Sequence, residues 1–158
     1  MERFTYIPNK QALLSALLED CLSKSSEAVE QACLDARGRA LPDMIQDVVV
    51  RFVDAKLAHT ELSAPYQISA EIGGPEIVKR MYQRCEKALG AMFETAPNAT
   101  SPYDPFATTM MFSAMSGAAR SVLEAGASPA LVSTLKERLV LLCQAYMEAE
   151  AHRIAVNP

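Results

Sequence analysis

Residues 4–14 read FTYIPNKQALL, an aromatic cluster that leads directly into the start of a helix. Pro8 is expected to break any helix before it, and the Asn9 side chain can cap the first amides of the helix that follows. Apolar residues then recur at helical spacing; they are Leu13, Leu14, Leu17, Leu18 and Cys21. The sequence therefore predicts a long amphipathic helix from about residue 9 to residue 36, which ends near Gly38.

Five further helices are predicted, separated by prolines and glycines, at 42–62, 65–72, 76–95, 105–125 and 130–153. Residues 48–53 have a strand-like composition, but the apolar residues around them follow helical spacing, which favours a buried helix. Asp104 and Ser128 are expected to cap the last two helices. Because no strand and no internal repeat is persuasive, the fold class is all-α, a bundle of about six helices.

The composition fits a single domain, since a chain of 158 residues buries roughly 70% of its unfolded surface. Half of the residues are apolar, and neither a signal-peptide pattern nor a membrane-spanning apolar run is present. We therefore expect a cytoplasmic protein that has no membrane partner. The four cysteines are predicted to be inert core thiols, because each falls in an apolar helical pattern; they are Cys21, Cys33, Cys85 and Cys143.

No residue pattern indicates catalysis or metal binding. The two histidines, His59 and His152, have no partners at metal-ligand spacing. Gly73-Gly74-Pro75 could cradle an anion, but no Lys-Ser/Thr pair follows, so a helix boundary is the preferred interpretation. The sequence predicts no enzyme activity, no metal and no cofactor. A polar cleft that placed His59 beside a carboxylate would favour an enzyme instead.

A group of soft, apolar side chains on helices 76–95 and 105–125 forms the candidate ligand site. Methionine adapts to irregular shapes, which suits a pocket for a hydrophobic ligand, although core filling is the preferred interpretation for any single methionine. Arg80 could add a polar contact at the pocket or lie on the surface. The predicted ligand-binding residues are Tyr66, Met81, Tyr82, Cys85, Met110, Met111 and Met115.

The last two helices carry apolar residues on more than one side, so one side can serve the core and another a partner. Small residues in helix 105–125 permit the close approach of a second helix. A two-fold, four-helix interface of a homodimer is therefore predicted. Its predicted contacts are Gly117, Ala118, Val132, Leu139, Val140, Cys143 and Met147. The alternative is a helix that is buried on both sides within one monomer.

Residues 4–14 closely resemble the exit of the helix-turn-helix of TetR-family repressors, which follows a pattern like Tyr-x-Tyr/His-Phe-x-Asn/Ser-Lys-x-x-Leu-Leu. The order of helices along the whole chain also resembles the C-terminal domain of that family. The resemblance implies that 1–8 is a remnant of the helix-turn-helix and that 9–158 is an effector-binding and dimerisation domain. It also places Tyr6 and Lys10 at DNA-phosphate contacts, while Phe4 and Ile7 depart from the family's tyrosine and phenylalanine.

The resemblance implies a regulatory domain of a transcriptional regulator that binds a small apolar effector and forms a homodimer. In that family the base-reading helices precede the motif, and a net charge of −4 without a basic stripe disfavours DNA binding. We therefore expect no specific DNA binding by this chain alone, whether it is an engineered truncation, a proteolytic core or a naturally short protein. The alternative function is a free-standing helical carrier that sequesters a hydrophobic small molecule.

Overall fold

The structure is a computed structural model that describes residues 3–58, 74–97 and 103–156. Within these ranges it contains five helices and no strand. The helices are α1 (Arg3–Ala36), α2 (Leu41–Leu57), α4 (Gly74–Phe93), α5 (Pro105–Glu124) and α6 (Pro129–Val156). The predicted all-α fold is confirmed, and the short helix predicted at 65–72 lies outside the described residues.

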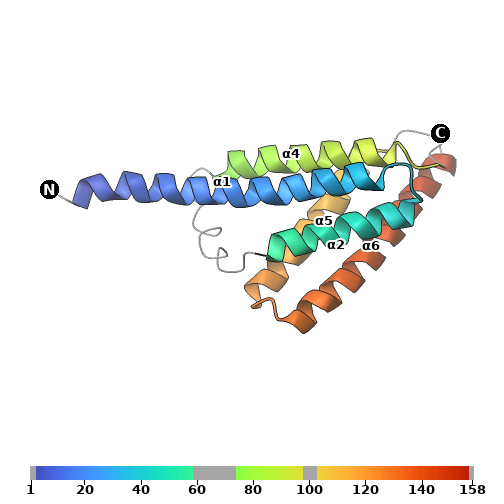
Figure 1. Cartoon of the computed structure of the whole chain (residues 1–158). Coiled ribbons are helices and arrows are strands. Elements are labelled where there is room, and N and C mark those ends of the chain that lie inside the picture. The colour runs from blue at the N-terminus through green and yellow to red at the C-terminus, as the bar shows by residue number, and fades with distance from the viewer. Residues whose placement is uncertain (1–2, 59–73, 98–102, 157–158) are drawn as a thin grey trace.

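The helices form a bundle from which the N-terminal part of α1 extends (Figure 1). Helices α1 and α4 lie side by side and run in the same direction, and α2 packs against both of them and against α6. Helix α5 packs against α4, α2 and α6. The described helices therefore surround a shared interior, in which α2 packs against each of the other four.

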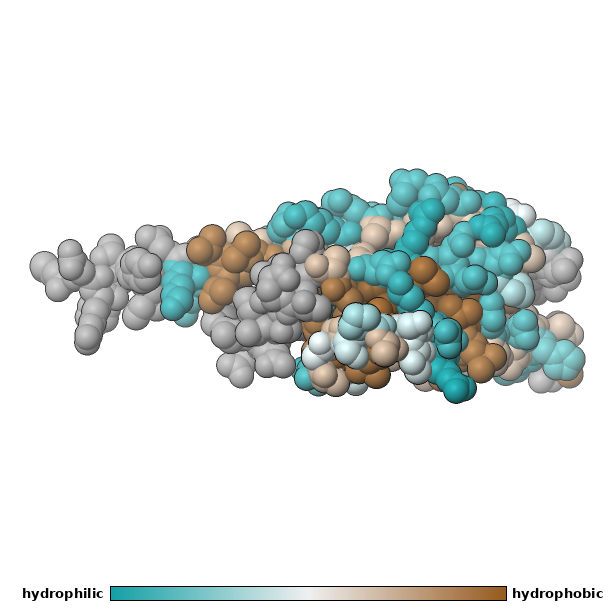
Figure 2. Space-filling model, turned by 60° about the horizontal axis from the view of Figure 1, so that its bottom comes forward, coloured by the Kyte–Doolittle hydropathy of each residue, from teal (hydrophilic) through white to brown (hydrophobic). Residues whose placement is uncertain are grey.

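Helix α1 begins at Arg3, and Pro8 does not end it, so the predicted start at an Asn9 cap is wrong. A proline at this position removes only the amide that would bond to the carbonyl of Phe4, near the free end of the helix. On the extension Leu13 and Leu17 are exposed. Figure 2 shows hydrophobic surface on this part of the molecule, beside the N-terminal end.

Helix α2 confirms that residues with strand-like composition form a buried helix here. Six of its apolar residues are buried at i, i+3 and i+4 spacing; they are Met44, Ile45, Val48, Val49, Phe52 and Val53. The helix ends at Leu57, five residues earlier than predicted, and residues 59–62 lie outside the described part. The polar residues Asp43, Gln46, Arg51 and Asp54 are exposed on its other side, so α2 is an amphipathic helix.

The ends of the other helices follow the local sequence signals. Gly38 has a φ of +74°, a left-handed conformation that stops α1 at little steric cost, and its amide donates to Thr95 Oγ1 at 2.9 Å. The carboxylate of Asp104 accepts from the Phe106 amide at 2.9 Å, and the Ser128 hydroxyl accepts from the Leu131 amide at 3.3 Å. Both predicted caps are therefore confirmed.

The buried residues form two separate groups. The main core joins all five helices, and its largest fully buried side chains include Phe93, Met44, Ile45, Leu89 and Met92. A satellite cluster joins only α1 and α4; it contains Leu18, Leu22 and Met81, with Ile77 and Val78 packed against them. The N-terminal half of α4 is thus held to α1 by a few apolar side chains, apart from the main core.

Candidate functional site

A small cavity of about 20 Å³ lies where α1, α2, α4 and α5 meet. This volume is close to the room that one water molecule needs. The cavity is lined by Leu22, Ser25, Ser26, Phe52, Lys56, Val78, Met81, Tyr82, Cys85, Phe112 and Ser116. Leu22, Val78 and Met81 belong to the satellite cluster, whereas Phe52 and Phe112 belong to the main core. The cavity therefore lies at the boundary between the two groups of buried residues.

Three aromatic rings form one wall of the cavity. Phe112 on α5 packs edge to face against Tyr82 on α4, with ring centroids 4.9 Å apart and planes at 78°. It makes a second such contact with Phe52 on α2, at 5.6 Å and 67°. Edge-to-face pairs of this kind hold each ring in one orientation. The aromatic wall is therefore fixed by three helices at once.

The cavity lining also includes buried polar side chains. The Cys85 thiol donates to the Ser26 hydroxyl at 3.6 Å, and this hydroxyl donates to Met81 Sδ at 3.7 Å. The Ser25 hydroxyl donates to the Cys21 carbonyl at 3.1 Å. Burial raises the pKa of Cys85, and the hydrogen bond to Ser26 opposes that rise only in part. The thiol is therefore protonated at neutral pH, and it acts as a weak donor rather than as a nucleophile.

Lys56 on α2 brings the positive charge of an ammonium group to the cavity wall. Burial lowers the pKa of this half-buried side chain, because water stabilises the ammonium less well there than in solution. Among the lining residues that the structure describes, none is an aspartate or a glutamate. The wall thus combines aromatic rings, small hydroxyl and thiol groups, and one cation.

The structure brings together only part of the predicted ligand site. Met81, Tyr82 and Cys85 line the cavity. Met111 and Met115 are buried in the main core and are not among the lining residues, so core filling describes them better. Met110 does not fit the prediction, because it is 47% exposed on the outer side of α5. Tyr66 lies outside the described residues, and Arg80 lies on the surface with its Nη2 3.9 Å from a Glu19 carboxylate oxygen.

Sequence reasoning missed the polar members of the cavity wall, which are Ser25, Ser26, Lys56 and Ser116. The serines of α1 occupy buried positions between Leu22 and Val29, on the face that packs against α4. Here the apolar stripe of α1 is interrupted by small polar residues. Such an interruption is a signal that could have indicated this site. Lys56 gives no such signal, because a lysine in the last turn of a helix is ordinary in sequence.

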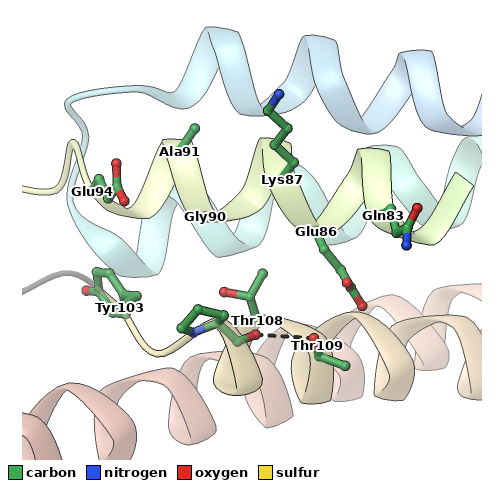
Figure 3. A pocket seen from close by; sticks show the side chains of 10 residues that line it. Gln83, Glu86, Lys87, Gly90, Ala91, Glu94, Tyr103, Thr108 and Thr109 are labelled. Carbon is green, nitrogen blue, oxygen red and sulfur yellow. Dashed lines mark hydrogen bonds between the residues drawn. The ribbon is translucent and has the colours of Figure 1, made fainter. Parts of the chain in front are cut away.

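A larger hollow of about 440 Å³ lies open on the surface between α4 and the start of α5. Figure 3 shows Glu86 extending from α4 toward α5, whereas Lys87 points away toward α1. Gly90 and Ala91 have little or no side chain, which leaves space between α4 and α5. Within α5, the Thr109 hydroxyl donates to the Pro105 carbonyl at 3.2 Å. Seven of the ten lining residues are polar or charged, and none of the predicted ligand-binding residues belongs to the hollow. The cavity between α1, α2, α4 and α5 is the better candidate for an apolar ligand, because three aromatic rings and several aliphatic side chains line it.

The predicted dimer contacts divide between the core and the surface. Leu139, Cys143 and Met147 are buried in the monomer's main core, which corrects their assignment to an interface. Their four-residue spacing, which Leu135 also shares, makes them the inward side of α6. Val132, Val140 and Ala118 are partly buried against the same core, and Gly117 is exposed.

The outward sides of α5 and α6 are rich in exposed apolar side chains. Phe106 and Met110 are exposed on α5, and Leu141 and Leu142 are exposed on α6. Residues 105–119 of α5 contain no charged side chain, although part of this stretch faces outward. An uncharged outward face that includes a 66% exposed phenylalanine is unusual for a surface that meets only water.

Metal ligands and membrane-spanning helices are two further features that bear on the function. Among the described residues, no group of three histidine, cysteine, aspartate or glutamate side chains is placed to hold a metal ion. None of the helices in the described ranges has both the length and the apolar content that a membrane crossing needs. His152 is exposed near the end of α6, and His59 lies outside the described part.

Comparison with known proteins identifies the family. The family described as "Tetracyclin repressor-like, C-terminal domain" matches residues 40–147, from the start of α2 into α6. No curated protein and no solved structure matches the chain at a significant level. The family match begins after α1, so the division of the chain at residue 8 stays a prediction. The match covers more than half of the chain, which therefore belongs to the TetR-like family of regulators and carries their C-terminal domain.

Proposed function

We propose that this domain binds a small, mainly apolar effector in the cavity between α1, α2, α4 and α5. C-terminal domains of the TetR family generally bind small-molecule effectors, which supports a ligand role for this part of the chain. The observation that carries the proposal is that the aromatic rings of Phe52, Tyr82 and Phe112 line the same cavity as the buried polar groups of Ser26 and Cys85. Apolar walls with a few fixed polar groups are typical of small-molecule sites.

Effector binding on this proposal requires the bundle to open, because a drug-sized molecule needs roughly 300 Å³ or more. The cavity of about 20 Å³ is the closed form of the site. Opening would be least costly at the boundary between the two buried groups, where Met81 and Val78 can move with α4 while the main core stays packed. A ligand that binds only the opened form shifts the population toward that form, and a tighter ligand shifts it further.

We further propose that the domain forms a homodimer through the outward sides of α5 and α6. Family domains of this kind generally dimerise. The exposed Phe106, Met110, Leu141 and Leu142 supply the apolar area that an interface core needs. In a dimeric regulator, a change in the angle between α4 and α1 would alter how the two N-terminal regions are spaced.

DNA reading is proposed to depend on residues outside the matched domain. Lys10, which the family resemblance places at a phosphate contact, is exposed on α1, and the side chain of Tyr6 lies outside the described part. The net charge of −4 gives this chain little attraction to DNA. A gel shift with candidate operator DNA should therefore show no specific nanomolar binding by the chain alone.

The effector proposal is tested with N-phenyl-1-naphthylamine, a neutral apolar dye that fluoresces when it leaves water. Titration into the protein should give saturable fluorescence. Ser116→Phe should abolish most of it, because a phenyl ring would fill the cavity beside Phe112. Unchanged dye binding by this variant, with its helix content and cooperative unfolding intact, contradicts the proposed site.

Gly90→Leu provides the matched control for dye binding elsewhere. Gly90 lines the open hollow between α4 and α5, and an added Cβ there meets no atom within 4 Å. The leucine should therefore occupy the hollow without disturbing the bundle, and dye binding should stay unchanged. Loss of binding in this variant, with normal binding in Ser116→Phe, would move the site to the surface hollow.

A further inference from the structure

We propose that the effector carries a hydrogen-bond acceptor oxygen, such as that of a ketone, on an otherwise apolar body, and that the Ser116 hydroxyl of α5 donates to this oxygen. The inference rests on the proposed function, because it names the chemistry of the ligand that would enter the same cavity. Ser116 lines that cavity and is 9% exposed. Its hydroxyl forms no hydrogen bond with any group in the described part of the chain.

Several other hydroxyl groups within the helices donate to the backbone carbonyl four residues before them, which is an ordinary arrangement for serine and threonine. Ser25 on α1 and Ser121 on α5 do so at 3.1 Å, and Thr134 on α6 does so at 3.0 Å. Ser116 does not bond to its own helix in this way. Its O–H group is therefore available to a molecule that enters the cavity.

The oxygen of Ser116 is also within reach of such a molecule. Among the described residues, no side-chain nitrogen or oxygen is both shut off from solvent and without a hydrogen bond. Because the Ser116 oxygen has no hydrogen bond, it is open to the space that its side chain lines. A ligand that expels water from a hydroxyl without replacing the lost hydrogen bond binds less well. The site therefore favours a ligand that places an acceptor oxygen at Ser116.

The groups around Ser116 define the rest of the ligand. Phe112 lies one helical turn before Ser116 on α5, and its ring packs edge to face against Tyr82 and Phe52. Ring surfaces of this kind suit an aliphatic or aromatic body. The Ser26 hydroxyl already bonds to two sulfur atoms, so it imposes no need for a polar ligand body. The arrangement places a hydroxyl donor next to aromatic surface, which fits an acceptor oxygen at one position of an apolar body.

The experiment compares 1-tetralone with tetralin as competitors of N-phenyl-1-naphthylamine. Both molecules have the same fused rings, and only the ketone carries an acceptor oxygen. Because tetralin is the more apolar of the two, each ligand is compared with itself between protein variants. Ser116→Ala should weaken tetralone about fivefold and leave tetralin within about twofold, as expected for the loss of one hydrogen bond. Equal changes for the two ligands would overturn the inference, and so would tetralone that fails to displace the dye from the unmodified protein.

Two further variants assign the effect to the hydroxyl. Ser116→Cys keeps nearly the same volume and replaces the O–H by a weaker S–H donor, so tetralone should weaken here as well under reducing conditions. A loss in Ser116→Ala that Ser116→Cys does not share would come from the change in volume and would overturn the inference. Ser121→Ala removes an exposed hydroxyl from the same helix and should change neither ligand.

Urea unfolding without ligand tests whether the Ser116 hydroxyl has no partner within the protein. A change from serine to alanine brings the same gain in helix propensity at Ser116 and at Ser25. Only the change at Ser25 removes a hydrogen bond, because that hydroxyl donates to the Cys21 carbonyl. Ser116→Ala should therefore unfold at the higher urea midpoint of the two variants. An equal or lower midpoint for Ser116→Ala would contradict the inference.

The proposed function and this inference fail in different ways. If the dye shows no saturable binding to the unmodified protein, the cavity is not an effector site and both proposals are wrong. If Ser116→Phe blocks the dye while Ser116→Ala leaves tetralone unchanged, the cavity stays a ligand site and only the acceptor on the ligand is wrong. Circular dichroism of each variant separates loss of binding from loss of folding.

Discussion

The guanidinium of Arg84 on α4 meets the carboxylate of Glu30 on α1 through two hydrogen bonds, 3.0 Å from Nε to Oε1 and 2.8 Å from Nη2 to Oε2. The pair lies directly beside the cavity, because Cys85 follows Arg84 and Ser26 precedes Glu30 by one helical turn. Two parallel bonds fix orientation as well as distance. The pair therefore sets the register of α4 against α1 at the level of the proposed site.

Arg84→Lys should lower the free energy of unfolding by about 0.5–1 kcal/mol, because lysine keeps the charge and loses the two-pronged contact. Arg80→Lys is the matched control on the same helix, since its guanidinium approaches Glu19 only to 3.9 Å. The control should change stability by less than about 0.3 kcal/mol. Urea unfolding of both variants checks the difference, and equal losses would show that the geometry of the Arg84 pair contributes nothing.

Two methionines of α5 should differ sharply in their contribution to stability. Met115 is 0% exposed in the main core, whereas Met110 is 47% exposed on the outer side of the helix. Met115→Ala leaves a cavity and should cost about 2–5 kcal/mol. Met110→Ala should cost less than about 0.5 kcal/mol, since it removes few contacts within the monomer. Urea unfolding at a concentration too low for self-association measures both, and a large loss for Met110→Ala alone would contradict this placement.

The helices of this protein follow from its local sequence signals. Spacing predicted the buried face of α2 despite its β-branched residues, and Asp104 and Ser128 cap the helices at which they were predicted. The predicted start of α1 was wrong, because the prediction considered only the tendency of Pro8 to break a helix. A proline close to a helix end removes a single hydrogen bond, which a long helix can tolerate.

The site was harder to predict, because spacing tells which side of a helix is apolar but not where neighbouring helices leave space. Met81, Tyr82 and Cys85 line the cavity, and their role in ligand binding stays a prediction, whereas Met110 and Met111 differ in burial although they are adjacent in sequence. On α6 the apolar residues extend around most of the helix. Spacing alone therefore could not tell whether Leu139 and Cys143 face the core or a partner subunit. Packing, rather than composition, decides these cases.

The buried thiols predict an alkaline loss of stability. Burial raises the pKa of Cys33 and of Cys143 from 9.0 to about 12. Since the folded pKa lies above the unfolded one, their stabilisation is fully present below pH 9 and is lost as the pH rises from 9 toward 12. In that window the unfolded chain releases protons that the folded chain keeps, so each thiol lowers stability by up to about 1.4 kcal/mol per pH unit.

Cys143→Ala isolates one of these thiols. Its stability should start lower at neutral pH, because the smaller side chain leaves a void, but should fall less steeply above pH 9 than that of the parent. Tyrosine and lysine titrations are the same in both proteins and cancel from the difference. Urea unfolding at several pH values under reducing conditions measures the two slopes, and identical slopes would contradict the raised pKa of Cys143.

The outward side of α6 provides the sharpest test of the proposed homodimer. Leu142 on α6 and Leu34 on α1 are each 53% exposed in the monomer. A change from leucine to glutamate therefore places one negative charge at a position of the same exposure in both variants. If α5 and α6 form the interface, Leu142→Glu places an unpaired carboxylate in an apolar contact, which costs several kcal/mol of association free energy. Leu34→Glu places the same group in water and costs little.

Sedimentation equilibrium at micromolar concentration should therefore give twice the 17.2 kDa chain mass for the parent and for Leu34→Glu, and the single chain mass for Leu142→Glu. Dimers of all three proteins would move the interface away from Leu142, and a monomeric parent would rule out the homodimer at this concentration. Loss of the dimer in Leu34→Glu alone would instead make α1 the contact. The two leucines differ in the helix that carries them and not in their exposure, so the position of the interface decides which variant loses the dimer.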